Sequence, residues 1–342
     1  MKIDGRKIGY DEPPYIVAEM SCNHCGDISN AIQLVKDAKE AGCSAIKVQC
    51  YSPDSLTIDA DLVVSGGLWE GERLYDLYFQ AQTHAHWMPV LFKTAKAQNI
   101  TMFASVFDLH GLDMLQSLDC PAYKVASFEL CHHELLAAIG RTGKPVIASL
   151  GCSDDTEALE ALRILTHNGC KELAMLHCVS TYPADEDTLY LRRIQELRKL
   201  TNERALIGFS DHTIVGVEES AVCAGACILE RHIRLPYTNS PDHAFSDNVD
   251  SMHTYCNLAH NAWLSMRPCE QGDAPTMFKR SIYCIKDVQE GEPFTRDNVA
   301  VIRPGYGLHP RLLDAVLDGV AKVAVQRGEP LTTDNVDAIG VC

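Results

Sequence analysis

Eight short runs of β-branched and other apolar residues alternate with segments of helical periodicity between Tyr15 and His232. Strands that alternate with helices pair in parallel, because each helix returns the chain to the same end of the sheet. Eight such units close into a barrel with the helices outside. The strands are predicted at residues 15–19, 45–50, 101–106, 122–127, 145–149, 173–178, 206–210 and 227–232. We therefore expect an α/β fold built on a (β/α)8 TIM barrel.

Two of the intervening segments show where helices begin and end. Residues 30–41 place apolar side chains on one face and stop before a glycine, the residue that commonly follows a helix C-terminus. Residues 155–166 follow Ser153 and Asp154, either of which can cap a helix, and Glu157 stands three residues after Asp154. Both segments are predicted to be helices on the outside of the barrel.

The length of the chain, 342 residues, exceeds the roughly 250 residues of a typical barrel. The polar, turn-rich segment 266–277 lacks periodicity and is predicted to be a linker. Residues 1–265 are then the barrel, and residues 278–342 form a small C-terminal domain. No internal repeat stands out in either part.

The chain is acidic, with 30 Lys and Arg against 46 Asp and Glu and a net charge of -16. This charge repels phosphodiester backbones and anionic membranes, so we expect neither nucleic acid nor a membrane as a partner. A small anion can bind only where cationic groups gather locally. The chain has no run of 18 apolar residues and no apolar core of a signal peptide near Met1, which predicts a cytoplasmic location.

Fifteen cysteines are scattered through the predicted strands and helices. This distribution favours reduced core thiols over a disulfide framework. Cys22 and Cys25 form one Cys-x-x-Cys pair, but no second pair completes a zinc site, so a metal or redox role for this pair is disfavoured.

Polar residues gather at the C-terminal ends of the predicted strands, where barrels of this kind place their chemistry. In chain order they include Glu19, Lys47, Gln49, Ser105, Lys124, Ser127, Glu129, Ser149, Ser180, Tyr182, His212, Glu230 and His232. One Lys or His in a strand usually extends to water or makes a structural hydrogen bond. Two lysines and two histidines buried in one barrel mouth, however, need an anion or a metal to compensate them.

His212 and His232 end adjacent predicted strands, where two imidazoles can share one divalent ion. Glu19 is predicted to be a third ligand or a substrate contact. Lys47 and Lys124, with the hydroxyls of Ser105, Ser127 and Ser149, predict a pocket for phosphate and carboxylate. A rival interpretation makes one lysine a Schiff-base nucleophile, as in a metal-free aldolase, but the histidine pair argues against it.

At these residues the chain resembles the sialic acid synthase family over nearly its whole length. The matching motifs are Ala18-Glu19, Asn23-His24, Ile46–Gln49, Tyr123–Glu129, Ser210–Thr213, Glu230–His232 and Pro241-Asp242 in the barrel, with Arg280–Tyr283, Lys286-Asp287 and Arg303–Pro310 in the tail. The resemblance implies a metal-dependent condensation of phosphoenolpyruvate with an amino sugar. It also implies that residues 278–342 form an antifreeze-like (SAF) domain. In that family the SAF domain covers the barrel mouth of the partner subunit in a domain-swapped homodimer.

The resemblance assigns roles to the residues that match. Glu19, Lys47, Lys124, Glu129, His212 and His232 are expected to be catalytic, with His212 and His232 holding a divalent metal, Mn2+ before Mg2+ or Co2+. The expected substrate-binding residues are Gln49, Ser105, Ser127, Ser149, Ser180, Tyr182, Asp242 and Arg303. A barrel that only binds sugar, without catalysis, is the remaining alternative class.

Within the family, the sequences of Gly67–Gly71 and Leu74–Tyr78 resemble those of pseudaminic acid synthases more than those of N-acetylneuraminate synthases. The expected acceptor is therefore 2,4-diacetamido-2,4,6-trideoxy-L-altrose, with N-acetylneuraminate or legionaminic acid synthesis as alternatives. In other proteins, a comparable aromatic stretch is most often the side of a helix that packs into the core. The chain departs from the family pattern at Leu150, where the family usually has Thr, and at Asn239-Ser240, which replace glycines.

Overall fold

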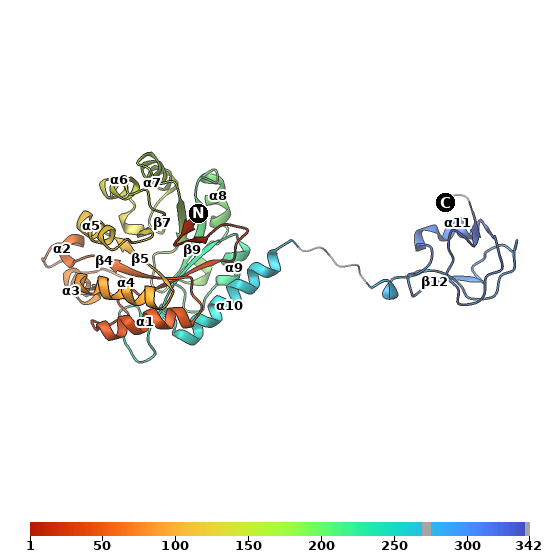
Figure 1. The fold of residues 1–342 in the computed structure, drawn as a ribbon, viewed down its shortest axis with the longest axis horizontal. Helices are drawn as coiled ribbons and strands as arrows, with labels where there is room; N and C mark the ends of the chain where they lie inside the picture. The colour runs from red at the N-terminus through yellow and green to blue at the C-terminus, as the bar shows by residue number, and fades with distance from the viewer. Residues whose placement is uncertain (269–274, 339–342) are drawn as a thin grey trace. The chain divides into compact units, whose positions relative to one another are not determined.

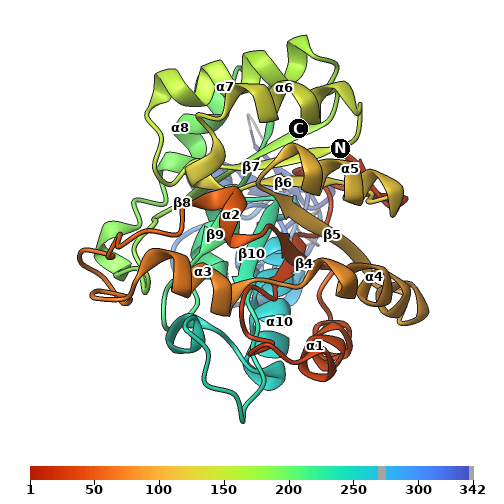
Figure 2. The ribbon, with the colours of Figure 1, turned by 90° about the vertical axis from the view of Figure 1, so that its left-hand side faces the viewer.

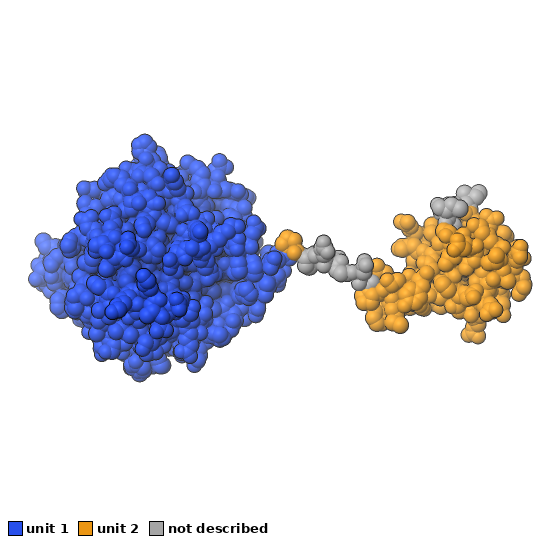
Figure 3. Space-filling model, in the orientation of Figure 1, with its two compact units in different colours: residues 1–267 blue, residues 268–342 orange. Residues whose placement is uncertain are grey.

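The structure is a computed structural model that describes residues 1–268 and 275–338. The chain divides into two compact units, residues 1–267 and 268–342, which Figures 1 and 3 distinguish. Half of the predicted linker, residues 266–277, lies outside the described residues, because residues 269–274 are not among them.

Unit 1 is a closed barrel of eight parallel strands, which confirms the predicted fold class. The strands are β3 (Tyr15–Glu19), β4 (Ala45–Cys50), β5 (Thr101–Val106), β6 (Tyr123–Val125), β7 (Val146–Ser149), β8 (Leu173–Cys178), β9 (Leu206–Asp211) and β10 (Ile228–His232). The last strand, β10, pairs with the first, β3, and this pairing closes the barrel. A short hairpin of β1 (Lys2–Ile3) and β2 (Arg6–Lys7) precedes the barrel in the sequence.

All eight strands occur where they were predicted, with small differences at their ends. The fourth predicted strand, residues 122–127, is shorter because a turn of 3-10 helix, Ser127–Glu129, begins directly after it. The seventh extends one residue further, to Asp211. These differences matter for the site, since they decide which side chains stand on a strand and which on the loop above it.

Helices surround the strands, as Figure 2 shows from α1 through α4, α5, α6 and α7 to α8. The outer helices are α1 (Ile28–Glu40), α4 (Met88–Ala97), α5 (Leu109–Ser117), α6 (His133–Arg141), α7 (Asp155–His167), α8 (Arg193–Leu200), α9 (Glu218–Cys223) and α10 (Val249–Met266). Of the two predicted caps of α7, Asp154 is the one used, and it forms a capping box with Glu157. None of the described helices combines the length and the apolar character needed to cross a membrane.

The segment between β4 and α4 is a long excursion above the barrel. It contains α2 (Pro53–Leu56), an antiparallel turn in which Val63 pairs with Arg73, and α3 (Leu74–Ala81). The helix α3 has no buried residue, so this aromatic stretch is not helix core. It therefore belongs to the loops that shape the mouth.

Unit 2 has its own small core, with strands β11 (Ser281–Cys284), β12 (Val299–Ile302), β13 (Val320–Ala321) and β14 (Val336–Asp337) and the short helix α11 (Leu313–Leu317). It contains an internal repeat, which sequence inspection missed. The two copies are residues 291–299 and 328–336. In the first, Asn298 accepts from the Thr295 N–H at 2.6 Å and donates to the Pro293 carbonyl at 3.0 Å. Asn335 makes the equivalent two bonds in the second copy, at 2.8 and 3.1 Å.

Candidate active site

The pairing register between neighbouring barrel strands places the polar residues at the strand ends opposite one another. His232 on β10 stands opposite Glu19 on β3, and Glu19 stands opposite Lys47 on β4. Two strands further, Ser105 on β5 stands opposite Lys124 on β6. Side chains that share a level and a face of a barrel converge on its axis, so the sequence-predicted residues of five different strands come together.

Lys47 is fully enclosed and paired. Its Nζ lies 2.6 Å from Oε2 of Glu19 and 3.6 Å from Oε1 of Glu230, and it donates to Oγ of Ser105 at 3.0 Å. Burial lowers the pKa of Lys47, but the two carboxylates outweigh burial and raise this pKa above its ordinary value. Lys47 is therefore a cation at neutral pH.

Lys124 has fewer anionic neighbours. Its Nζ donates to Oγ of Ser149 at 2.6 Å and to the carbonyl of Val125 at 3.2 Å, and Oε1 of Glu230 lies 3.9 Å away. Burial lowers the pKa of Lys124, and Glu230 offsets only part of that effect. The two lysines thus differ, with Lys124 the one that gains more from a further anion.

Glu230 is a buried residue that the sequence placed at a strand end but to which no catalytic or binding role was assigned. It contacts both lysines and accepts from Ser210 Oγ at 3.2 Å. Burial raises the pKa of Glu230, but Lys124 and Lys47 outweigh burial and hold this pKa below its ordinary value. Its position two residues before His232, on the same face of β10, was the available signal.

The carboxylates change the interpretation of the lysine cluster. From the sequence, an anion or a metal was expected to compensate the two lysines. In the structure Glu19 and Glu230 already do so, and two carboxylates balance two ammonium groups. The lysines therefore belong to a neutral group of paired charges rather than to a bare cationic pocket.

His212 and His232 are brought together as predicted, with ring centroids 5.7 Å apart. His212 Nδ1 lies 2.8 Å from the carbonyl of Val179, so Nδ1 carries the proton and Nε2 keeps its lone pair. Burial, with the neighbouring His232, lowers the pKa of His212 to about 4. His232 Nδ1 faces Oδ2 of Asp242 at 3.3 Å.

This donor set fits a divalent ion held by two imidazoles. Metal-ligating histidines are usually oriented by a carbonyl or a carboxylate, and water or substrate supplies the remaining positions. Within residues 1–268 and 275–338, no third His, Cys, Asp or Glu side chain is arranged with them as a ligand. Glu19 faces Lys47 and Gln49 instead, so it does not complete a three-residue ligand set here.

The other predicted residues take varied places. Gln49 donates to Glu19 at 2.8 Å and to Ser21 at 3.1 Å, while Ser127 and Ser180 lie 3.1 Å from each other. Ser127 makes no hydrogen bond with either lysine, unlike Ser105 and Ser149. The predicted phosphate contacts thus divide into two direct lysine partners and one serine on the neighbouring loop.

Glu129 stands on the turn directly after β6. Burial raises its pKa to about 7, although Lys124 partly opposes the shift, and its Oε2 has no hydrogen-bond partner. A carboxyl with this pKa exchanges a proton near neutral pH.

Arg303, predicted to reach the sugar, belongs to unit 2, where it is exposed.

Aromatic rings cover one side of the histidine pair. Tyr182 lies on His212 with centroids 4.4 Å apart, and Phe245 lies 4.9 Å from His232 and 5.2 Å from Tyr182. Trp69 extends the group, 5.5 Å from Tyr182. These side chains come from loops after β4, β8 and β10.

Two of the three residues that depart from the family pattern, Ser240 and Leu150, make defined local contacts. Ser240 donates to Oδ1 of Asn23, and Asn23 in turn donates to Ser246 at 3.0 Å, so the serine connects the loop after β10 with the loop after β3. Leu150 is buried, 7% exposed, and packs into the barrel core.

The Cys-x-x-Cys pair is not a disulfide: Cys22 is buried and Cys25 exposed, and both are free thiols.

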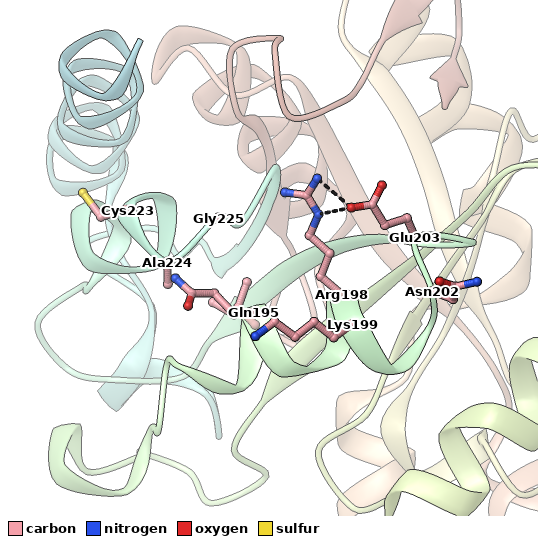
Figure 4. A pocket seen from close by; sticks show the side chains of 9 residues that line it. Gln195, Arg198, Lys199, Asn202, Glu203, Cys223, Ala224 and Gly225 are labelled. Carbon is pink, nitrogen blue, oxygen red and sulfur yellow. Dashed lines mark hydrogen bonds and ion pairs between the residues drawn. The ribbon is translucent and has the colours of Figure 1, made fainter. Parts of the chain in front are cut away.

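A pocket of about 660 Å³ lies at the opposite, amino-terminal end of the barrel, between the end of α8 and the turn before β10 (Figure 4). Its Arg198 is already paired with Glu203 at 3.0 Å and stacks on Tyr10 at 4.0 Å. None of the site residues predicted from the sequence lines this pocket.

The closed barrel and the lysine, glutamate and histidine groups in its mouth define a barrel protein of the sialic acid synthase type. The chain belongs to the NeuB family, whose model matches residues 34–270, and a SAF domain model matches residues 279–337. The SAF match confirms the expected class of the C-terminal domain.

Relatives agree with this family. The chain is 33% identical to a pseudaminic acid synthase of Campylobacter jejuni, over 92% of this chain and 94% of the relative. It is also 33% identical to a pseudaminic acid synthase of Helicobacter pylori, over 90% and 93%. Its fold is similar to that of the spore coat polysaccharide biosynthesis protein SpsE of Bacillus subtilis, with a TM-score of 0.68, 28% identity and 98% of each chain covered.

Proposed function

We propose that this protein is a pseudaminic acid synthase. It would condense phosphoenolpyruvate with 2,4-diacetamido-2,4,6-trideoxy-L-altrose and water to give a nonulosonic acid and phosphate. The observation that carries the proposal is the arrangement of Lys47 and Lys124 around Glu230, beside the pair His212 and His232. The similarity to pseudaminic acid synthases supports the choice of acceptor.

Phosphoenolpyruvate would bind at the lysines. Lys47 and Lys124 both lie near Oε1 of Glu230, at 3.6 and 3.9 Å, and they donate hydrogen bonds to Ser105 and Ser149, respectively. A phosphate and a carboxylate on one small molecule suit two separated ammonium groups. Ser127 and Ser180 extend this polar surface on the neighbouring loops.

His212 and His232 would hold the divalent metal, for which we propose Mn2+. Bound there, the ion acts as a Lewis acid toward the aldehyde oxygen of the open-chain sugar. The chain itself keeps the two imidazoles in place, through the Val179 carbonyl and the Asp242 carboxylate. Gln49, Tyr182, Asp242 and Arg303 are proposed to orient the sugar.

In the proposed reaction, the third carbon of phosphoenolpyruvate forms a bond to the aldehyde carbon, whose oxygen takes a proton. Water adds to the second carbon and loses a proton, and we propose that Glu129 receives it. The second carbon then becomes a ketone as its bond to the phosphate oxygen breaks and its hydroxyl loses a proton. The leaving phosphate takes one proton, so two protons are released and two are taken up. With a pKa near 7, Glu129 suits this exchange, and Glu19 is the second candidate for it.

We also propose a homodimer in which the SAF domain of each subunit covers the mouth of its partner. Loops around the mouth expose large apolar side chains, a feature typical of protein interfaces. They include Ile58, Phe79, Phe128, Ile214 and Tyr237, which are 67%, 60%, 61%, 60% and 71% exposed. Sedimentation of the full chain, and of a chain ending at residue 267, tests this arrangement.

A cytoplasmic location is proposed from the thiols. The thirteen described cysteines are free, and several of them lie in strands and helices of the core. Unpaired cysteines in this number suit a reducing compartment.

A phosphate-release assay tests the function. We expect phosphoenolpyruvate to release phosphate faster with the trideoxy diacetamido sugar than with N-acetylmannosamine or the legionaminic acid precursor. We expect no release after a chelator has removed the metal. Release that survives chelator contradicts the metal role. Borohydride inactivation in the presence of substrate supports the Schiff-base alternative, and sugar binding without phosphate release supports a non-catalytic barrel.

A further inference from the structure

Three aromatic rings form a continuous surface that starts at the histidine pair and leads outward. The ring centroid of Tyr182 lies 4.4 Å from that of His212, 5.2 Å from that of Phe245 and 5.5 Å from that of Trp69. We call Trp69, Tyr182 and Phe245 the aromatic wall. Phe245 is 1% exposed and forms its base, while Trp69 is half-buried and forms its outer end.

The position of Trp69 is determined by two separate loops. It lies on the turn between paired residues Val63 and Arg73, where the Val64 N–H donates to the Glu72 carbonyl at 2.9 Å. Its indole Nε1 donates to the carbonyl of Pro241 at 3.3 Å. The excursion after β4 is thereby connected to the loop after β10.

The hydrogen bond to Pro241 has a chemical consequence. It occupies the only polar atom of the indole, so Trp69 offers a bound molecule ring carbons alone. Pro241 directly precedes Asp242, which faces His232 at 3.3 Å. The aromatic wall therefore has the carboxylate of Asp242 near its inner end, at the histidines, and is apolar at its outer end, Trp69.

An acceptor bound with its aldehyde at His212 and His232 would extend its other end along this wall. We propose that Trp69 is a specificity-determining residue that contacts the terminal carbon of the acceptor and favours a methyl group over a hydroxymethyl group there. This inference rests on the proposed function. It deepens that function by assigning the choice between 6-deoxy and 6-hydroxy sugars to one side chain.

The physical basis is the different cost of enclosing the two groups. A methyl group gains from contact with an aromatic face, whereas a hydroxyl enclosed there loses hydrogen bonds to water. Apolar surfaces reject an added hydroxyl only moderately, by about 10- to 100-fold, because the molecule still fits. The expected preference is of that size.

The test compares kcat/KM for the trideoxy diacetamido sugar and for its 6-hydroxy counterpart, with phosphoenolpyruvate saturating. The wild type is expected to prefer the 6-deoxy sugar by about 10-fold or more. W69A is expected to bring the ratio close to one, mainly by lowering kcat/KM for the 6-deoxy sugar. The KM for phosphoenolpyruvate should stay unchanged, because Trp69 contacts neither lysine.

Two variants separate specificity from folding. W263A removes another half-buried indole, from α10 away from the mouth, and should keep the wild-type ratio. W69F keeps an apolar ring without the Pro241 hydrogen bond and should keep most of the preference. Where W69A does not fold, W69Q, which leaves a polar side chain at the outer end of the wall, gives the same expected loss.

An unchanged ratio in W69A, or an equal fall for both sugars, overturns the role of Trp69. In that outcome the proposed function stands, because the wild type still turns over. Wild-type protein that releases no phosphate with either sugar overturns the function, and the inference with it.

Discussion

Nζ of Lys47 lies 2.6 Å from Oε2 of Glu19, the residue directly opposite on the neighbouring strand. The pair is almost completely buried, with side chains 4% and 1% exposed. In a low-dielectric site such a contact is strong, so an anion that binds Lys47 competes with Glu19 for it.

The first prediction concerns this competition. E19Q removes the competing carboxylate while Glu230 still accompanies Lys47, so phosphoenolpyruvate or inorganic phosphate should bind more tightly. Thermal melts at increasing phosphate concentration measure this, and the rise in Tm should be larger in E19Q than in the wild type. Turnover should fall in the same variant. An equal rise in Tm contradicts the competition.

The second prediction is a pH dependence from Glu129, whose pKa is raised to about 7 by burial. As the acceptor of the proton from water, this carboxyl must be ionised, so kcat/KM should rise with pH through about 7. E129Q should lose this limb and about 100-fold or more in kcat. A profile measured with E134Q, on the exposed first turn of α6, should match the wild type. A wild-type profile that falls through pH 7 contradicts the role of base.

The third prediction concerns metal binding, read without turnover. Adding Mn2+ to chelator-treated protein should raise the Tm of the wild type, because the ion binds only the folded state. H212N and H232N should abolish this rise, while H167N, at the exposed end of α7, should keep it. Persistence of the rise in both site variants places the metal elsewhere.

The fourth prediction concerns stability outside the mouth. Arg231 is 1% exposed and lies 2.7 Å from Asp247 and 3.3 Å from Asp211, and it donates to the Thr213 carbonyl at 2.6 Å. R231M leaves the buried carboxylate of Asp211 and the partly buried one of Asp247 without their cation, and should lower the free energy of unfolding by about 3–5 kcal/mol.

Urea unfolding measures this loss. The matched control is R163M, because Arg163 forms an exposed pair with Glu160 at 3.8 Å and its loss should cost less than about 1 kcal/mol. Similar effects of the two substitutions contradict the prediction. Since Arg231 also contacts the loop that follows His212, R231M should weaken the Mn2+-induced rise in Tm as well.

Much of the barrel was predictable because its signals are local. Each strand is a short apolar run, and some outer helices carry a local capping signal, as Asp154 and Glu157 show for α7. Lys47, Lys124, His212 and His232 were predictable for the same reason, since a polar residue at the end of a buried strand stands out within a few positions of sequence.

Contacts between distant segments were not predictable in this way. The role of Glu230 depends on the register that places it between Lys47 and Lys124. The contact of Trp69 with Tyr182 joins residues from loops after β4 and β8, whose path no local pattern specifies. The internal repeat of unit 2 was visible in the sequence and was missed.

The sequence by itself determined the eight strand–helix units, the SAF-type tail and the residue types available in the mouth, because each depends on neighbours along the chain. The tertiary structure alone decided that Glu19 and Glu230 neutralise the lysines, that Asp242 faces His232, and that aromatic rings cover the histidines. These pairings depend on closure of the barrel and on the register between strands. Both follow from packing summed over the whole core, which no short segment of sequence contains.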